Sequence, residues 1–223
     1  MTKEKQKIVY LTIDDCPSKD FIEKIDYLCS NNIKAILFCT GKKMKKNSEE
    51  IIYAIKRGFI IGNHSYSHLR FSIITPQEAE RQIKVTEDII NILYKKAKVK
   101  RKFKIFRFPY GDPGTIGNKS IFQFILKKYG YKKLKLKNIK YKWFNFYFGE
   151  RIDLFWTYDF TEYKIKNIRK MIGKITNMRG NLNDKKTRDI LLLHDKSQST
   201  KLFYKIMNGL IERNIKFVLP DIR

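Results

Sequence analysis

The feature that most constrains the fold of this chain is a regular alternation. Short apolar runs rich in β-branched residues are followed by longer segments with apolar residues at helical spacing. The first run, IVYLTI at residues 8–13, ends in Asp14-Asp15 and breaks at Pro17, as a buried strand does where it enters a loop. The alternation continues without an internal repeat or a linker. It predicts a single α/β domain over residues 1–223 with parallel strands.

Seven runs are typical of strands: residues 8–13, 33–39, 59–61, 103–106, 154–158, 190–193 and 215–219. The segments between them predict helices at residues 21–29 (with Ser18 as cap), 48–57, from 75 onward, 120–129, 165–178 and 200–212. The helix at Thr75 has the clearest start, with a Thr cap, Pro at the first helical position and Glu at the third. For residues 131–155 we expect only some extended structure.

Composition excludes several classes of protein. Lys and Arg total 48 against 22 Asp and Glu, a net charge of +26, yet 43% of the residues are hydrophobic, which is too apolar for a disordered basic tail. The apolar stretches are far shorter than the roughly 20 residues of a transmembrane helix. The first 15 residues lack the apolar region of a signal peptide, so we expect a cytoplasmic protein. Cys16, Cys29 and Cys39 lack Cys-x-x-Cys spacing, so we expect reduced thiols.

Four polar clusters directly follow predicted strands, at residues 14–15, 64–68, 107–112 and 194–195, and they contain all three histidines of the chain. Parallel strands of a barrel bring their carboxyl ends to one face, where barrel enzymes place their chemistry. Because polar residues gather after several different strands, the sequence favours a barrel over an open sheet.

His64 and His68, four residues apart, would share one face of a helical turn. Two histidines and a carboxylate such as Asp15 can bind zinc or a similar divalent metal and leave positions open for water and substrate, although such a pair also arises by chance. Asp14 and Asp15 would point in opposite directions on an extended chain and so have different roles; a helix cap or a solvated turn is the alternative. His194 fits a third metal ligand, a general acid or a core histidine.

The order of the motifs resembles the polysaccharide deacetylases, also called the NodB-homology domain or carbohydrate esterase family 4. The motifs are Thr12-Ile13-Asp14-Asp15, His64-x-x-x-His68, Arg107-x-Pro109-Tyr110-Gly111, Trp156-x-x-Asp159-x-x-Glu162-Tyr163 and Leu192-Leu193-His194. They cover nearly the whole chain, from about residue 8 to residue 219. The resemblance implies a distorted (β/α) barrel with about seven parallel strands, in agreement with the number of predicted strands.

The resemblance also implies an activity. Asp15, His64 and His68 would bind a divalent metal, usually zinc, with Co²⁺, Ni²⁺ or Mn²⁺ as alternatives. Asp14 would be the general base, and Arg107 would pair with it and orient it. The enzyme would hydrolyse N-acetyl, or O-acetyl, groups of an amino-sugar-containing glycan or glycan precursor and release acetate.

The other motifs would act on the substrate. The backbone N–H of Tyr110, which follows Pro109, would help to hold the oxyanion of the tetrahedral intermediate. His194 would be the general acid that protonates the leaving amine. Its proton donation matters because an amine is a poor leaving group unless it is protonated as the C–N bond breaks.

Two positions depart from the family pattern. Cys16 stands where Gly normally follows the two aspartates, and its thiol would be either a small buried group or an extra metal ligand. Glu162-Tyr163 replaces the usual Asp-Trp pair of the fourth motif, so the carboxylate that tunes the general acid is Asp159 or Glu162. Trp156 and Tyr163 would supply aromatic surface for a sugar ring.

A basic stretch, Lys132 to Lys142, precedes a group of aromatic residues. It suits an anionic or lipid-linked sugar, or it is a solvated loop in a lysine-rich proteome. Polyanion or nucleic-acid binding is the alternative to catalysis, because the net charge of +26 gives salt-sensitive affinity for polyanions. No nucleic-acid-binding module is recognisable, so we expect no specific nucleic-acid partner. A non-catalytic homologue and a hydrolase of a small non-sugar amide are further alternatives.

Overall fold

A computed structural model describes residues 6–162 and 180–221. Within these residues a six-stranded sheet has the order β3-β2-β1-β5-β4, and β6 pairs with the start of β1. The strands are β1 (Ile8–Cys16), β2 (Ile36–Cys39), β3 (Ile60–Asn63), β4 (Tyr158–Asp159), β5 (Asp189–His194) and β6 (Lys216–Phe217). All of these pairings are parallel, as the alternation of strands and helices predicts.

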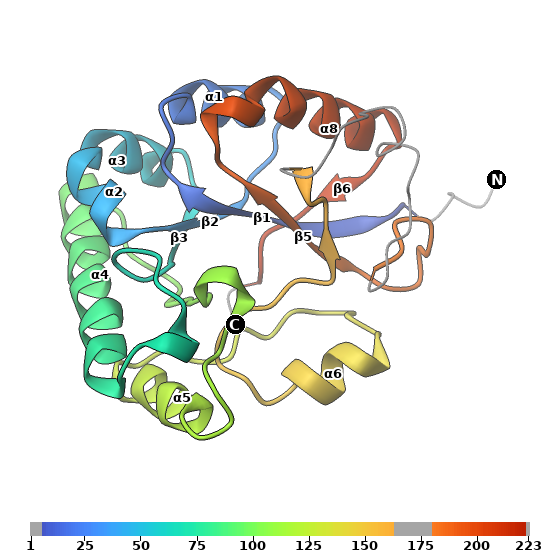
Figure 1. The fold of residues 1–223 in the computed structure, drawn as a ribbon. Helices are drawn as coiled ribbons and strands as arrows, with labels where there is room; N and C mark the ends of the chain where they lie inside the picture. Colours follow the sequence, from blue (N-terminus) through green and yellow to red (C-terminus); the bar gives the residue numbers. More distant parts are fainter. Residues whose placement is uncertain (1–5, 163–179, 222–223) are drawn as a thin grey trace.

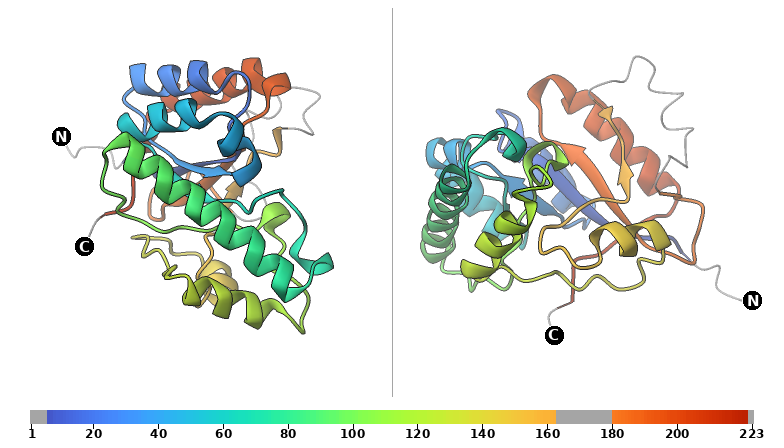
Figure 2. Two further views of the ribbon diagram at one scale, coloured as in Figure 1. Left: turned by 90° about the vertical axis from the view of Figure 1, so that its left-hand side faces the viewer. Right: turned by 60° about the horizontal axis from the view of Figure 1, so that its bottom comes forward.

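The helices surround the sheet on several sides. They are α1 (Phe21–Ser30), α2 (Gly41–Lys46), α3 (Ser48–Lys56), α4 (Pro76–Ala97), α5 (Lys119–Lys128), α6 (Lys142–Phe148) and α8 (Thr200–Glu212). Figures 1 and 2 show α1 and α8 side by side on one side of the sheet, with α5 and α6 on the opposite side. The predicted start of α4 is confirmed, because Thr75 Oγ1 accepts a hydrogen bond from the Glu78 amide at 3.2 Å.

Backbone hydrogen bonds outside the named strands close the sheet into a distorted barrel. Beyond β3, the Asn63 amide donates to the Ile105 carbonyl (2.8 Å) and the Arg107 amide donates to the Asn63 carbonyl (3.0 Å). The Leu154 amide then donates to the Phe106 carbonyl (2.8 Å). The chain continues from Leu154 into β4, which pairs with β5. The predicted barrel is confirmed, with six strands among the described residues where about seven were expected.

The expected strand at residues 103–106 is the one that is missing. It is reduced to a single parallel bridge between Asn63 and Phe106. On the other side of this segment, the Phe106 carbonyl accepts a hydrogen bond from the Leu154 amide. These contacts do not make the regularly spaced ladder of a parallel strand.

Three other expectations differ from the structure. Residues 131–155, expected to be extended, contain α6, whose consecutive aromatic residues hide the helical spacing. The strand expected at 154–158 is shifted to β4, at Tyr158–Asp159. Ser18 does not cap α1, which begins at Phe21, and its hydroxyl instead donates to Asp195 at 2.6 Å. The helix expected at 165–178 lies outside the described residues.

The alternation of side chains along β1 places polar groups inside the barrel. Val9, Leu11 and Ile13 pack in the core cluster that includes residues of α1, α3 and α8. Tyr10 belongs to a second cluster on the other face of the strand, and Asp14 has the same parity as Tyr10 and so faces this side. No helix in the described ranges is both long and apolar enough to cross a bilayer.

Candidate functional site

Two aspartates at the end of β1 form the centre of the candidate site. β1 lies between β2 and β5, and Asp14 is the register partner of His194 on β5. Asp14 is buried, and Asp15 has a left-handed backbone with φ of 65°. One oxygen of each carboxylate lies 3.7 Å from His64 Nε2, so the expected opposite directions of the two side chains are wrong, because the backbone of Asp15 leaves the extended geometry on which that alternation depends.

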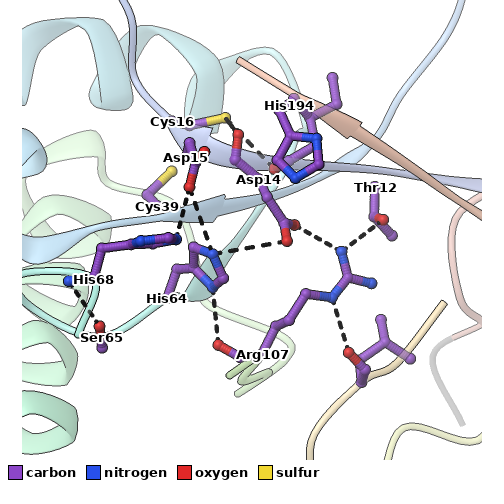
Figure 3. A network of polar contacts seen from close by, with 12 residues as sticks. Thr12, Asp14, Asp15, Cys16, Cys39, His64, Ser65, His68, Arg107 and His194 are labelled. Atoms are coloured by element: carbon purple, nitrogen blue, oxygen red, sulfur yellow. Dashed lines mark hydrogen bonds and ion pairs between the residues drawn. The ribbon is translucent and has the colours of Figure 1, made fainter. Parts of the chain in front are cut away.

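Arg107 reaches Asp14 from the opposite wall of the barrel. Its Nη1 donates to Asp14 Oδ1 at 2.7 Å and to Thr12 Oγ1 at 2.8 Å, and its Nε donates to the Leu154 carbonyl at 2.9 Å. The guanidinium is buried and lies over the Phe38 ring, 4.2 Å from the centroid. These contacts fix both the position of the guanidinium and the direction in which Asp14 points (Figure 3).

Asp15, His64 and His68 come together at the end of β1, next to Asp14 (Figure 3). One ligand atom from each residue lies within 4.8 Å of the other two. His68 Nε2 is 2.9 Å from Asp15 Oδ1, and His64 Nε2 is 3.7 Å from the same oxygen. His64 Nδ1 lies 2.9 Å from the Arg107 carbonyl oxygen; since a carbonyl only accepts, Nδ1 carries the proton and Nε2 has a free lone pair.

This arrangement fits a divalent cation. Two imidazoles and one carboxylate are the donor set that catalytic zinc sites use. The bond from His64 to the Arg107 carbonyl fixes the tautomer and ring orientation, as outer hydrogen bonds do for metal-ligating histidines. We conclude that these three residues could hold a metal such as zinc.

Burial and charge shift the pKa values of this group in opposite directions. Burial alone would raise the pKa of Asp15, but the hydrogen bond from His68 and the charges of His64, His68 and His194 hold that pKa well below its usual range. Burial lowers the pKa of His64, with Asp14 opposing this effect. An ionised Asp15 and a neutral His64 are the forms that bind a metal.

The loop that carries His64 and His68 is held by side chains of neighbouring elements. Asn63 Oδ1 accepts from the Ser65 amide at 2.9 Å, and its Nδ2 donates to the Tyr131 hydroxyl at 2.7 Å. Gln82 Oε1, from α4, accepts from the amides of residues 66 and 67. Because β3 and α4 both hold this loop, His68 keeps its left-handed backbone, with φ of 61°.

His194 ends β5 and is paired with Glu162. Its Nδ1 lies 2.9 Å from Glu162 Oε1, which also accepts from the His194 amide at 2.5 Å. Burial would lower the pKa of His194, but the hydrogen bond and charge of Glu162, with those of Asp14 and Asp15, raise it above its usual value. Glu162 therefore contacts the His194 ring directly. Asp159 accepts from the Thr161 amide at 2.7 Å, and burial raises its pKa.

The third and fourth motifs meet at the rim of the site. Pro109 begins a 3₁₀ turn, Pro109–Gly111, and Tyr110 within it has φ of 59° and packs against His68, with ring centroids 4.6 Å apart. A Cβ on Gly111 would lie 2.7 Å from the Trp156 ring, so the turn and the ring are in close contact. Tyr163 lies outside the described residues.

Cys16 is fully buried beside Cys39, its register partner on β2. Its thiol donates to the Ile13 carbonyl at 3.5 Å. Burial, and then the contact with Cys39, raise the pKa of Cys16 well above its usual value. Cys16 therefore stays a neutral thiol, whereas metals bind the thiolate. Among the described residues, the group that could hold a metal does not include Cys16. We therefore interpret Cys16 as a small buried side chain.

Sequence reasoning missed the residues that position the site through single hydrogen bonds. Thr12 and the Leu154 carbonyl hold Arg107. Gln82 holds the loop that carries His64 and His68. Lys43 Nζ donates to the Asp15 carbonyl at 2.5 Å. Thr12 could have been found, because a Thr within a buried apolar strand needs a hydrogen-bond partner. The others lie on distant elements and carry no local signal.

Comparison with known proteins identifies the family. The sequence model of the polysaccharide deacetylase family matches residues 2–134. A peptidoglycan-N-acetylglucosamine deacetylase of Bacillus cereus is 37% identical over 105 residues, which are 47% of this chain and 36% of that protein. The matched part thus spans only about a third of that relative.

Solved structures share the fold. A family 4 carbohydrate esterase from Streptomyces lividans, in complex with acetate, has a TM-score of 0.68 at 19% identity, and the match covers 96% of this chain and 92% of that one. A carbohydrate esterase family 4 pseudoenzyme from Bacillus anthracis has a TM-score of 0.66 at 18% identity, covering 95% of this chain and 63% of that one. Both likenesses show a common barrel architecture.

The barrel and the order of its motifs define a carbohydrate esterase family 4 type of domain. Because the family's sequence model matches more than half of its residues, this chain belongs to the polysaccharide deacetylase family. The resemblance stated from the five motifs is confirmed.

Proposed function

We propose that this protein is a divalent-metal-dependent hydrolase that removes N-acetyl groups from an amino-sugar-containing glycan or glycan precursor. The observation that carries the proposal is the placement of three groups at the carboxyl ends of parallel strands, among them β1, β3 and β5. The Asp14–Arg107 pair lies between the Asp15, His64 and His68 group and His194. The Bacillus cereus relative, named for peptidoglycan N-acetylglucosamine, supports an amino-sugar substrate.

We propose that Asp15, His64 and His68 hold the metal, with Zn²⁺ preferred and Co²⁺, Ni²⁺ or Mn²⁺ as alternatives. When bound, such a cation polarises the acetyl carbonyl and makes a water more acidic. The protein orients His64 through its hydrogen bond to the Arg107 carbonyl, and His68 Nε2 and Asp15 Oδ1 face each other at 2.9 Å across the place that the metal would take.

Asp14 is the proposed general base. Its Oδ1 is occupied by Arg107, while Oδ2 lies 3.7 Å from His64 Nε2 and so faces the metal-binding group. A water between this oxygen and the acetyl carbon would lose its proton to Asp14 as it attacks. The fixed guanidinium holds the carboxylate in the orientation that this transfer needs.

His194 is the proposed general acid. Attack of water on the acetyl carbon gives a tetrahedral intermediate, and the C–N bond breaks as His194 gives its proton to the nitrogen, leaving acetate and a free amine. Glu162 favours the charged imidazolium, because it accepts from Nδ1 and lies in a buried position. The charged form of His194 is the one that can donate this proton.

The rim residues complete the proposed site. The backbone N–H of Tyr110 would stabilise the oxyanion, with Pro109 fixing the start of the turn that carries it. Trp156 and Tyr163 would offer aromatic surface to a sugar ring. We also propose that residues 1–223 form one catalytic domain.

An acetate-release screen tests the proposed function. The purified protein, supplied with Zn²⁺ or Co²⁺, is incubated with chitooligosaccharides, peptidoglycan fragments, lipid-linked N-acetyl sugars and small acetamides, and acetate is measured by a coupled assay. We expect release from one class of N-acetylated sugar. Release from small acetamides alone would reassign the substrate, and no release from any substrate would indicate a non-catalytic homologue.

The pH dependence of kcat/KM tests the role of Glu162. Because Glu162 raises the pKa of His194, the protonated acid is present at low pH, and activity falls as pH rises through that pKa. In Glu162→Gln the charge is lost, so we expect this alkaline fall to move down by about one pH unit. Asp159→Asn is the matched comparison. A shift in Asp159→Asn but not in Glu162→Gln would assign the tuning role to Asp159.

A further inference from the structure

One segment of the chain is free of acidic residues. No Asp or Glu lies between Asp112 and Glu150, whereas residues 113–149, which we call the basic segment, contain nine lysines. At the average frequency of the chain, 22 acidic residues in 223, about four would be expected there. A codon bias explains many lysines in the whole chain, but it does not explain the local loss of acidic residues.

All nine lysines of the basic segment are exposed: Lys119, Lys127, Lys128, Lys132, Lys133, Lys135, Lys137, Lys140 and Lys142. Within residues 6–162 and 180–221, two of them pair with a carboxylate, Lys128 with Glu80 and Lys137 with Asp221. Seven ammonium groups therefore face solvent without an acidic partner in the described part of the chain. Their mutual repulsion is relieved when they meet a surface of negative charge.

The basic segment also exposes apolar side chains. Five of the eleven large hydrophobic side chains exposed in the described residues belong to it: Ile116, Ile121, Phe124, Phe146 and Tyr147. The side chains of Ile116 and Phe146 are 90% and 82% exposed. In α6, five of the seven residues are aromatic, yet none of the seven is buried. Phe144 packs, partly buried, against the core, and an aromatic helix without a fully buried side chain is typical of an interaction surface.

The fold brings the parts of the basic segment together on one side of the barrel. α5 and α6 lie on the side opposite α1 and α8 (Figures 1 and 2). A cavity of about 830 Å³ lies between α5 and α6, lined by Lys119 of α5, Trp143 and Tyr147 of α6, and Arg151. A second cavity combines lysines 132, 133 and 135 with the apolar side chains of 134 and 136. Cationic and apolar groups are thus interleaved across this side.

We propose that the basic segment docks on the surface of a lipid bilayer that contains anionic phospholipids. Lysines would meet the phosphates, and exposed aromatic and aliphatic side chains of α5 and α6 would enter the headgroup region, where aromatic residues are favoured. A soluble polyanion such as a nucleic acid would use the lysines, but it would leave Ile116 and Ile121 in water. The combination of both kinds of group favours the bilayer.

The docking surface is connected to the candidate site through stacked rings. Phe148 of α6 stacks on Phe155, with centroids 4.0 Å apart and planes at 10°. Phe155 stacks on Trp156 at 3.9 Å and 14°, and the Trp156 ring lies 5.6 Å from the Arg107 guanidinium. Docking through α6 would therefore place the bilayer next to the rim of the site, where a substrate carried on a lipid could reach it.

Vesicle sedimentation tests the proposal independently of any enzymatic activity. The full chain is mixed with vesicles of phosphatidylcholine alone or with 30% phosphatidylglycerol, and bound protein is measured against lipid concentration. We expect binding to the anionic vesicles only. A protein with a net charge of +26 binds such vesicles through its overall charge alone. Matched variants are therefore needed to show that the basic segment itself binds the bilayer.

The first pair of variants separates this surface from the net charge. Lys132→Gln/Lys133→Gln/Lys135→Gln should lower the partition coefficient by about 100-fold, since each lysine near an anionic membrane contributes about a fivefold factor. The control, Lys42→Gln/Lys45→Gln/Lys46→Gln, removes the same charge from exposed positions of α2. An equal loss in both triple variants would overturn the proposal in favour of non-specific attraction.

The second pair separates the bilayer from a soluble polyanion. Phe146→Gln/Tyr147→Gln should weaken vesicle binding by about tenfold and leave retention on heparin unchanged. The control, Ile92→Gln/Ile211→Gln, removes two exposed apolar side chains from α4 and α8 and should bind vesicles like the wild type. If Phe146→Gln/Tyr147→Gln binds vesicles as the wild type does, apolar insertion is absent, and the surface is one for soluble polyanions.

Discussion

Asp14→Asn should lower kcat/KM for acetate release by about 1000-fold, the size of effect expected for loss of a general base. Asparagine keeps the size of the side chain, and its carbonyl oxygen can still accept from Arg107 Nη1, which lies 2.7 Å from Asp14 Oδ1 in the wild type. It cannot take the proton of the attacking water. Asp14 is outside the Asp15, His64 and His68 group, so the metal content of dialysed protein, measured by plasma mass spectrometry, should stay unchanged.

A matched variant controls for disturbance of the buried Arg107. Thr12→Ser keeps the hydroxyl that accepts from Nη1 at 2.8 Å and should retain most of the activity. Two results would contradict the assigned role of Asp14: full activity of Asp14→Asn, or loss of its metal together with its activity. The second result would place Asp14 among the metal ligands.

Loss of one histidine donor should remove both metal and activity. For His68→Gln we expect zinc affinity to fall by about 100-fold or more, because even outer-shell partners of metal ligands contribute 10–100-fold. His68 is the safer position for this test, since its side chain is 25% exposed while that of His64 is 2% exposed. Competition with a chromophoric chelator measures the affinity, and added Zn²⁺ should restore activity only at high concentration.

Cys16→Ala provides the matched control for the metal site. The Cys16 thiol is buried and donates to the Ile13 carbonyl, so its removal should lower thermal stability slightly and leave zinc affinity unchanged. A fall in affinity similar to that of His68→Gln would make the thiol a ligand. Unchanged affinity in both variants would rule out the Asp15, His64 and His68 group as the metal site.

Local sequence signals predicted the helices well where capping and amphipathic spacing agree. α8 begins and ends at the predicted residues, Thr200 and Glu212, and α4 begins at its predicted Thr75 cap. α6 was missed because its aromatic residues are adjacent in sequence and none is buried, so no apolar face appears in the pattern. The prediction of a strand at 103–106 was also wrong, because that segment forms only a single bridge among the described residues. The number of backbone hydrogen bonds that a segment makes depends on the segments beside it and not on its own composition.

The choice between Asp159 and Glu162 shows why part of the site was beyond sequence reasoning. Both carboxylates have the spacing to reach the end of β5, and both are partly or fully buried. The backbone of Thr161, with φ of 47°, turns the chain between them. Asp159 Oδ1 then meets the Thr161 amide, while Glu162 reaches the His194 ring. This choice between the two carboxylates depends on the backbone turn at Thr161, which the residue types do not specify.

The amino-acid sequence by itself determined the parallel α/β architecture, the family, and the positions of polar residues at strand ends. Hydrophobic periodicity and the order of the motifs can be read along the chain without knowing which segments meet in space. Only the tertiary structure decided which atoms meet. Arg107 is held by Thr12, Asp14 and the Leu154 carbonyl, residues 47 to 95 positions away. The same closure of the barrel gathers exposed lysines and exposed rings on one side, because the packing of the core decides which side chains remain outside it.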